Sequence, residues 1–193
     1  MPINKIINDA TLHATLRNSI GEEGITVGIA KSLLTADDCL DNEVVAILKL
    51  DSFFAYNSRE TPNPPKAIDY LVVVRCCDRS IRLYLIELRK SEGRNRTDRI
   101  SPQEIVGKFQ TVANDFFPRF PEIFNRENVS KVTAHLVTDP WKLRDKPDAD
   151  NKFSQKIKLS ALDRYGSQKP LSILGRAVII NPILPPNPII EPC

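Results

Sequence analysis

Two acidic residues, Asp69 and Glu87, stand in neighbouring segments that are rich in β-favouring residues. The segments Ile68–Arg75 and Ser80–Lys90 predict a β-hairpin. If the turn is centred on Asp78, Asp69 lies directly opposite Glu87, and the two Cβ atoms are about 5 Å apart. Carboxylates this close repel each other unless a positive charge lies between them. A divalent cation is the simplest candidate, because magnesium accepts one or two protein carboxylates and keeps its other sites for water and phosphate.

Two alternatives to this arrangement remain open. A two-residue turn would place Leu88 opposite Asp69, but such turns favour Asn-Gly, Asp-Gly or a leading glycine, which the sequence lacks here. In the second alternative, Glu87 forms an ordinary ion pair with Arg89 or Arg75 on a solvated strand face. The apolar residues that share this face favour a position at the rim of a core.

An aspartate on one strand, then a hairpin, then Glu-x-Lys on the next strand resembles the PD-(D/E)XK nuclease superfamily, which includes many restriction endonucleases. The matching residues are Ile68-Asp69 and Glu87-Leu88-Arg89, and the element order matches over roughly residues 25–138. The resemblance implies that Asp69 and Glu87 bind Mg²⁺ or Mn²⁺. It also implies that Arg89 occupies the position of the lysine that orients or activates the attacking water. Arginine keeps the positive charge of that lysine but cannot act as a base in water.

The resemblance also suggests further site residues. Families of this kind often add an acidic residue from before the first core strand and a polar residue from the helix after the motif. Lys90 follows the motif but begins on the opposite strand face, so it reaches the site only if the strand bulges. The candidates are Glu43, Glu22 and Glu23 for the acid, and Gln103, Lys108 and Gln110 for the helix.

Two basic stretches are candidates for contact with phosphates, which gives salt-dependent and sequence-independent affinity. The first follows the motif strand directly, and its predicted nucleic-acid-binding residues are Arg94, Arg96 and Arg99. The second extends from Lys142 to Lys169. Simple solvation of charged loops is the alternative for both stretches.

The remaining elements must position the hairpin. Ser101-Pro102-Gln103-Glu104 predicts a helix start, because it offers an N-cap hydroxyl, proline at the first helical position and a glutamate three residues after the cap. Strands are predicted at 44–54 and 131–138 and at the short segment 177–180, and helices at 4–20 and 25–34. The predicted fold class is α/β: a mixed β-sheet with a central hairpin flanked by helices, an αβββαβ core that is restriction-endonuclease-like.

The whole chain fits one domain of 193 residues, with a core at about 25–138 and a basic, proline-rich C-terminal extension at 139–193. The net charge of +3 is too balanced for a histone-like binder. The proline-rich tail is expected to stay outside the sheet. The four cysteines lack CxxC spacing, so we expect reduced thiols rather than a zinc site or disulfides. We see neither a secretory signal nor a membrane-spanning run, and predict a cytoplasmic protein.

The resemblance therefore implies a magnesium-dependent DNA endonuclease of the restriction, defence or repair type. Asp69 and Glu87 are predicted to hold the metal, and Arg89 to stabilise the developing charge. A homodimer is expected if the DNA site is two-fold symmetric. The alternative is a nuclease-like domain that has lost catalysis and serves as a DNA-binding or protein-interaction subunit, which the arginine at position 89 favours.

Overall fold

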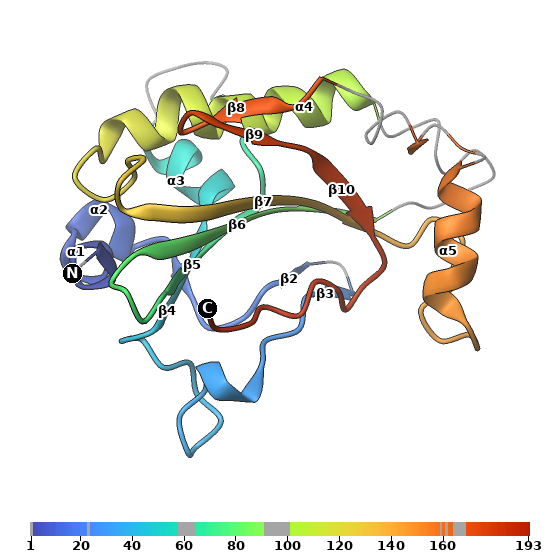
Figure 1. Ribbon diagram of the computed structural model, residues 1–193, viewed down its shortest axis with the longest axis horizontal. Coiled ribbons are helices and arrows are strands. Elements are labelled where there is room, and N and C mark those ends of the chain that lie inside the picture. The colour runs from blue at the N-terminus through green and yellow to red at the C-terminus, as the bar shows by residue number, and fades with distance from the viewer. Residues whose placement is uncertain are drawn as a thin grey trace.

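A six-stranded mixed sheet, in the order β1-β4-β5-β6-β7-β10, organises the computed structural model of the protein (Figure 1). The structure describes residues 2–22, 24–57, 65–90, 101–158, 160, 162–163 and 169–193. Neighbouring strands are antiparallel from β1 to β6, and β6, β7 and β10 are parallel. The sheet strands are β1 (Leu16–Arg17), β4 (Val45–Lys49), β5 (Tyr70–Arg75), β6 (Ile81–Arg89), β7 (Val129–Thr138) and β10 (Ile180–Ile183). The mixed α/β class that the sequence predicts is confirmed.

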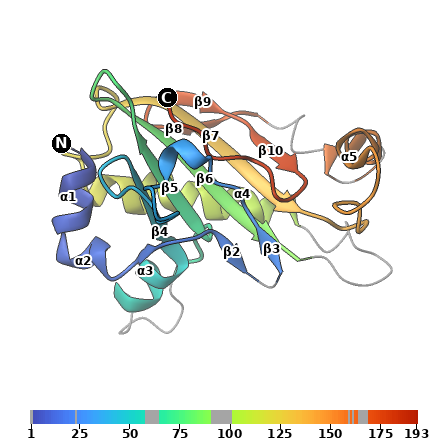
Figure 2. The same cartoon turned by 90° about the horizontal axis from the view of Figure 1, so that it is seen from below.

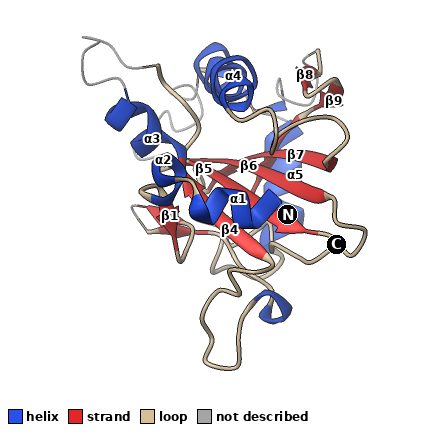
Figure 3. Ribbon diagram, turned by 90° about the vertical axis from the view of Figure 1, so that its left-hand side faces the viewer, coloured by secondary structure: helices blue, strands red, loops and turns tan. Residues whose placement is uncertain are grey.

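The two faces of the sheet are covered differently. Helices α3 and α4 lie over one face, and the strands β2 and β3 lie with the C-terminal segment over the other (Figures 1 and 3). The helices are α1 (Pro2–Asn8), α2 (Ala10–His13), α3 (Leu50–Asn57), α4 (Pro102–Thr111) and α5 (Ala149–Lys158). Two small hairpins are formed by β2 (Gly21–Glu22) with β3 (Ile25–Thr26), and by β8 (Leu171–Ile173) with β9 (Arg176–Val178).

Helix α4 is the main element between β6 and β7, and it begins as its sequence predicts. Ser101 is the N-cap, and its side chain accepts a hydrogen bond from the Glu104 backbone N–H. The helix buries Ile105 and Phe109 against the sheet and continues through a π-helical turn, Val112–Phe116, in which Val112 and Phe116 are buried. Buried rings continue beyond this turn, where the ring centroids of Phe117 and Phe124 lie 5.0 Å apart.

Of three local predictions in the N-terminal part of the chain, two are wrong and the third is confirmed only in its first half. The helix expected at 4–20 breaks at Asp9, whose carboxylate accepts the N–H groups of Thr11 and Leu12 and caps the separate helix α2. Leu16–Arg17 then pairs with β4. The helix expected at 25–34 is instead β3 followed by a 3₁₀ turn, Lys31–Leu33. The strand expected at 44–54 ends at Lys49, and α3 follows, because a short run that is apolar on all sides fits a buried strand or a buried helix.

The C-terminal segment departs from two further expectations. Residues 180–183 join the sheet as β10, where Pro182 is tolerated because β10 is an edge strand. Cys76 and Cys193 form a disulfide across 117 residues of sequence, so the expectation of four reduced cysteines is wrong. Spacing along the chain could not reveal this pair, because the tail returns to the β5–β6 turn only in the folded state. Among the described residues, no helix is long and apolar enough to cross a membrane.

Candidate functional site

The β5–β6 hairpin adopts the register that places Asp69 and Glu87 together. Tyr70 pairs with Ile86, and Asp69 and Glu87 are the next residues on the two strands. The turn is closed by the Cys76 N–H, which donates to the Ser80 carbonyl at 2.8 Å, and Asp78 lies at its centre. The alternative register, with Leu88 opposite Asp69, is not formed.

Asp69 is fixed at the end of this ladder by its own side chain. Its Oδ2 accepts the Leu88 backbone N–H at 2.6 Å, and its backbone carbonyl accepts the Leu50 N–H at 2.9 Å. The residue is only 8% exposed. Burial raises the pKa of Asp69 to about 6, although the positive charge of Lys108 and the bond from Leu88 oppose the shift. Two backbone hydrogen bonds therefore set the position of Asp69.

Glu87 is fully buried yet surrounded by charge. Its Oε1 accepts a hydrogen bond from Lys108 Nζ at 2.7 Å and forms an ion pair with Arg89 Nε at 2.9 Å. Its Oε2 is buried and has no hydrogen-bond partner among the described residues. Burial and the nearby Asp69 carboxyl raise the pKa of Glu87 to about 7 in spite of the two cations. One oxygen of Glu87 is thus engaged by two cations, and the other has no partner in the described part of the chain.

Lys108 connects the two acids from helix α4. Its Nζ lies 2.7 Å from Glu87 Oε1 and 3.9 Å from Asp69 Oδ1, and its side chain is mostly buried. The helix directs it there because Lys108 lies three residues after the buried Ile105 and next to the buried Phe109. The sequence named Lys108 only as one of three polar helix candidates. The signal that could have distinguished it is this position on the apolar side of the helix.

The charged groups line one cleft of about 200 Å³ at the end of the hairpin. Arg89, at the rim, donates from Nη2 to Glu104 Oε1 at 3.0 Å, so it bridges β6 and α4. Glu22 reaches the cleft from β2 and forms an ion pair with Lys49. The lining residues are Glu22, Ile25, Asp69, Glu87, Leu88, Arg89, Lys90 and Lys108. Of the predicted acids from before the core, Glu22 therefore reaches the cleft.

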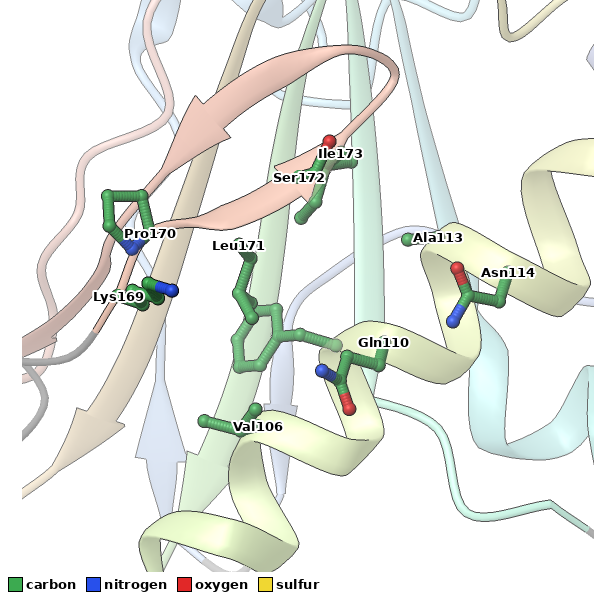
Figure 4. A pocket seen from close by; sticks show the side chains of 10 residues that line it. Val106, Gln110, Ala113, Asn114, Lys169, Pro170, Leu171, Ser172 and Ile173 are labelled. Atoms are coloured by element: carbon green, nitrogen blue, oxygen red, sulfur yellow. The ribbon is translucent and has the colours of Figure 1, made fainter.

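Other candidates lie elsewhere. Glu43 precedes β4 at the end of the sheet opposite Asp69, because Val45 pairs with Val74 there and Lys49 with Tyr70 at the cleft end. Gln103 is exposed and accepts a hydrogen bond from Ser101 Oγ. Gln110 lines a different cavity, of about 490 Å³, between α4 and the β8–β9 hairpin (Figure 4). Glu23, Arg94, Arg96 and Arg99 lie outside the described residues.

The cleft offers a small set of oxygen donors to a divalent cation. Among the residues that the structure describes, no group of three or more His, Cys, Asp or Glu side chains is arranged to hold a metal. Two carboxylates are sufficient for magnesium, which completes its shell with water and phosphate oxygens. Glu87 Oε2, which is buried and has no hydrogen-bond partner among the described residues, fits this requirement, and Asp69 lines the same cleft.

Comparisons with family models, with curated proteins and with solved structures gave no match.

Proposed function

We propose that the protein is a metal-dependent nuclease and that the Asp69–Glu87 cleft hydrolyses phosphodiester bonds in DNA. The observation that carries the proposal is the adjacent placement of two buried carboxyls beside two cationic side chains. One of the carboxyls has an oxygen with no hydrogen-bond partner among the described residues. Carboxylate oxygens are ligands that magnesium and manganese ions prefer. The positive side chains of Arg89 and Lys108 can attract the phosphate that such an ion activates. Burial strengthens each of these interactions because the local dielectric is low.

Each residue has a specific task in this proposal. Asp69 and Glu87 would hold Mg²⁺ or Mn²⁺, which supplies an activated water and neutralises charge on the phosphate. The Leu88 N–H orients Asp69 by its 2.6 Å bond. Arg89 stabilises negative charge on the phosphate but cannot remove a proton. Lys108 brings an ammonium group to the same glutamate, so the site keeps a lysine although it comes from α4 rather than from β6.

The surrounding elements support a restriction-endonuclease-like core as part of the proposal. A hairpin carries the acids, helix α4 follows it, and β7 returns parallel to β6 with Glu87 paired to Leu136. This is the strand, strand, helix, strand part of the αβββαβ order that the resemblance implies. β3 and a 3₁₀ turn stand where the first helix of that order is expected, and α3 separates β4 from the hairpin. Helix α4 also contributes Lys108 and Glu104 to the site, so the crossover is part of the proposed active centre.

One observation favours the alternative of an inactive DNA-binding or protein-interaction subunit. Glu87 is 0% exposed, and its Oε1 already contacts both Lys108 and Arg89. A cation entering the cleft must therefore compete with two fixed positive charges. The same contacts would be present if these charges only stabilised the fold of a domain without catalytic activity.

Incubation of purified protein with plasmid DNA separates the two functions. Wild-type protein should cut with Mg²⁺ or Mn²⁺ and stop when a chelator is added, and Asp69→Asn and Glu87→Gln should not cut. Glu43→Gln is the matched control, because Glu43 is an acid at the far end of β4, and it should cut as the wild type does. Thermal unfolding of each variant confirms that it is folded. Equal cleavage by Glu87→Gln and wild type would overturn the proposal, and DNA binding without any cleavage would favour the inactive subunit.

A further inference from the structure

After β7, the strand that pairs with β6, the chain continues into a folded, basic segment. Arg89, the last residue of β6, pairs with Thr138, the last residue of β7, whose Oγ1 donates to the Arg89 carbonyl at 2.8 Å. Residues 141–158, here called the basic arm, start three residues after Thr138 and end with α5. In Figures 1 and 2, α5 stands at the end of the sheet where β7 finishes. The basic arm therefore begins at the edge of the cleft.

A direct bond joins the basic arm to the cleft wall. Arg144 Nη1 donates to the Gly24 carbonyl at 2.6 Å. Gly24 lies in the connection between β2 and β3, which contribute Glu22 and Ile25 to the cleft lining. The position of the arm relative to the cleft is thus set by a strand pairing on one side and by a side-chain bond on the other.

The basic arm is a packed platform with its own small core. Phe153 from α5 and Leu143 from the preceding loop are buried with Leu184. Trp141 lies edge-on to Phe153, with 5.5 Å between the ring centroids, and Lys156 Nζ lies 5.8 Å from the centre of the Trp141 ring. This packing holds α5 in place and directs its other faces to solvent.

Positive charge is concentrated on the solvent side of this platform. Residues 141–158 contain six basic and three acidic side chains, a net charge of +3, which equals the net charge of the whole chain, so the rest of the protein sums to zero. Of the acids, Asp145 pairs with Arg144 at 3.5 Å and Asp150 is contacted by Asn187 at 3.5 Å. Five lysines are exposed, and no carboxylate of the described residues pairs with them: Lys142, Lys146, Lys152, Lys156 and Lys158.

We propose that the basic arm binds the phosphate backbone of the DNA that enters the Asp69–Glu87 cleft. This inference rests on the proposed function and names the surface that would hold the substrate. Exposed lysines act as point charges that attract phosphates without reading bases, which gives binding that is independent of sequence and dependent on salt. The arm begins beside the cleft, where Arg144 contacts the Gly24 carbonyl, so a backbone bound along the arm lies next to the proposed active centre.

Salt-dependent binding tests the arm separately from catalysis. A short fluorescent DNA duplex is titrated with protein in chelator, so that nothing is cut, at several salt concentrations. In the variant Lys146→Gln/Lys158→Gln, the slope of log K against log salt should shrink by about 2, because each phosphate contact contributes about 0.9. Binding at low salt should weaken about tenfold or more. The matched control is Lys5→Gln/Lys31→Gln, which removes two exposed lysines outside the arm and should leave the slope unchanged.

The outcomes distinguish the two proposals. Equal slopes for the arm and control variants, or no binding of DNA by the wild type, would overturn the proposal that the basic arm binds DNA. Binding to vesicles that contain phosphatidylserine, with no binding to DNA, would also overturn it and point to an anionic membrane surface. Another outcome is that the salt dependence decreases in the arm variant while the wild type cuts no DNA with either metal. That result would support DNA binding by the basic arm and overturn the proposed nuclease activity. If DNA is cut and the arm and control variants have equal slopes, the result would support the nuclease activity and overturn DNA binding by the basic arm.

Discussion

Lys108 Nζ and Glu87 Oε1 lie 2.7 Å apart, with one partner on helix α4 and the other on the central strand β6. Both side chains are largely removed from water, at 13% and 0% exposed. A charged hydrogen bond in such a place couples the position of the helix to the protonation of the glutamate. The same contact places an ammonium group at the proposed catalytic centre.

Removing the Lys108 charge should destabilise the protein more at alkaline pH than at acidic pH. Lys108→Met should lower the free energy of unfolding by about 3 kcal/mol at pH 8, because Glu87 then stays buried with less compensation. At pH 5 the loss should be smaller, because Glu87 can be protonated. Urea unfolding at both pH values measures this, with Lys31→Met at an exposed position as the control. Equal losses at the two pH values would show that Lys108 contributes only packing.

The two carboxyls should lower the stability of the folded protein as the pH rises from about 4 to 7. Burial raises the pKa of Asp69 from 3.8 to about 6 and that of Glu87 from 4.5 to about 7. The folded state therefore holds more protons than the unfolded state between about pH 4 and 7, so this contribution to stability is present at the low end and is lost as the pH rises. The unfolding midpoint of Glu87→Gln should fall less between pH 5 and 8 than that of wild type. An equal decline would contradict the raised pKa.

The attachment of helix α4 can be tested at one ring. Phe109 is 0% exposed, so Phe109→Ala should cost about 3–5 kcal/mol in the free energy of unfolding. Gln110→Ala, at the exposed next position, should stay within about 0.5 kcal/mol of wild type. Chemical denaturation gives both values. An unchanged midpoint for Phe109→Ala would contradict the packing of α4 on the sheet.

The disulfide between Cys76 and Cys193 should stabilise the fold by restricting the unfolded chain. Cys193→Ser should lower the free energy of unfolding by about 2–5 kcal/mol under oxidising conditions. A reducing agent should bring wild type to the value of the variant and should not affect the variant further. Cys77→Ser is the control, because Cys77 is exposed and unbonded. A wild-type protein that is insensitive to reductant would show that the bond does not form in solution.

Local patterns predicted the elements that carry the site. The capping box at Ser101 fixed the start of α4, and the absence of a tight-turn dipeptide correctly favoured a turn centred on Asp78, which put Asp69 beside Glu87. These features depend on residues near one another in sequence. The mixed sheet followed from the hairpin and the helical crossover.

The missed features depend on tertiary contacts that no local pattern encodes. Residues 16–17 leave a helical pattern because β4 offers them backbone partners. Glu22 enters the cleft because Gly24, with φ of 82°, turns the chain into the β2–β3 hairpin. Cys193 meets Cys76 only because the tail runs beside residues 28–30, where the Ile190 N–H donates to the Gly28 carbonyl at 2.8 Å. Patterns within a single segment do not encode these contacts between distant parts of the chain.

The two edges of the sheet also limit how copies of this protein can associate. One edge is β1, with only two residues, and the other is β10, where Pro182 has no N–H to offer a neighbouring chain. Short edges and edge prolines both discourage a strand from another molecule from extending a sheet. A continuous intermolecular sheet is therefore disfavoured, both as a route to aggregation and as a way to build a symmetric pair. Contacts between copies are therefore expected to use side chains on the faces of the molecule.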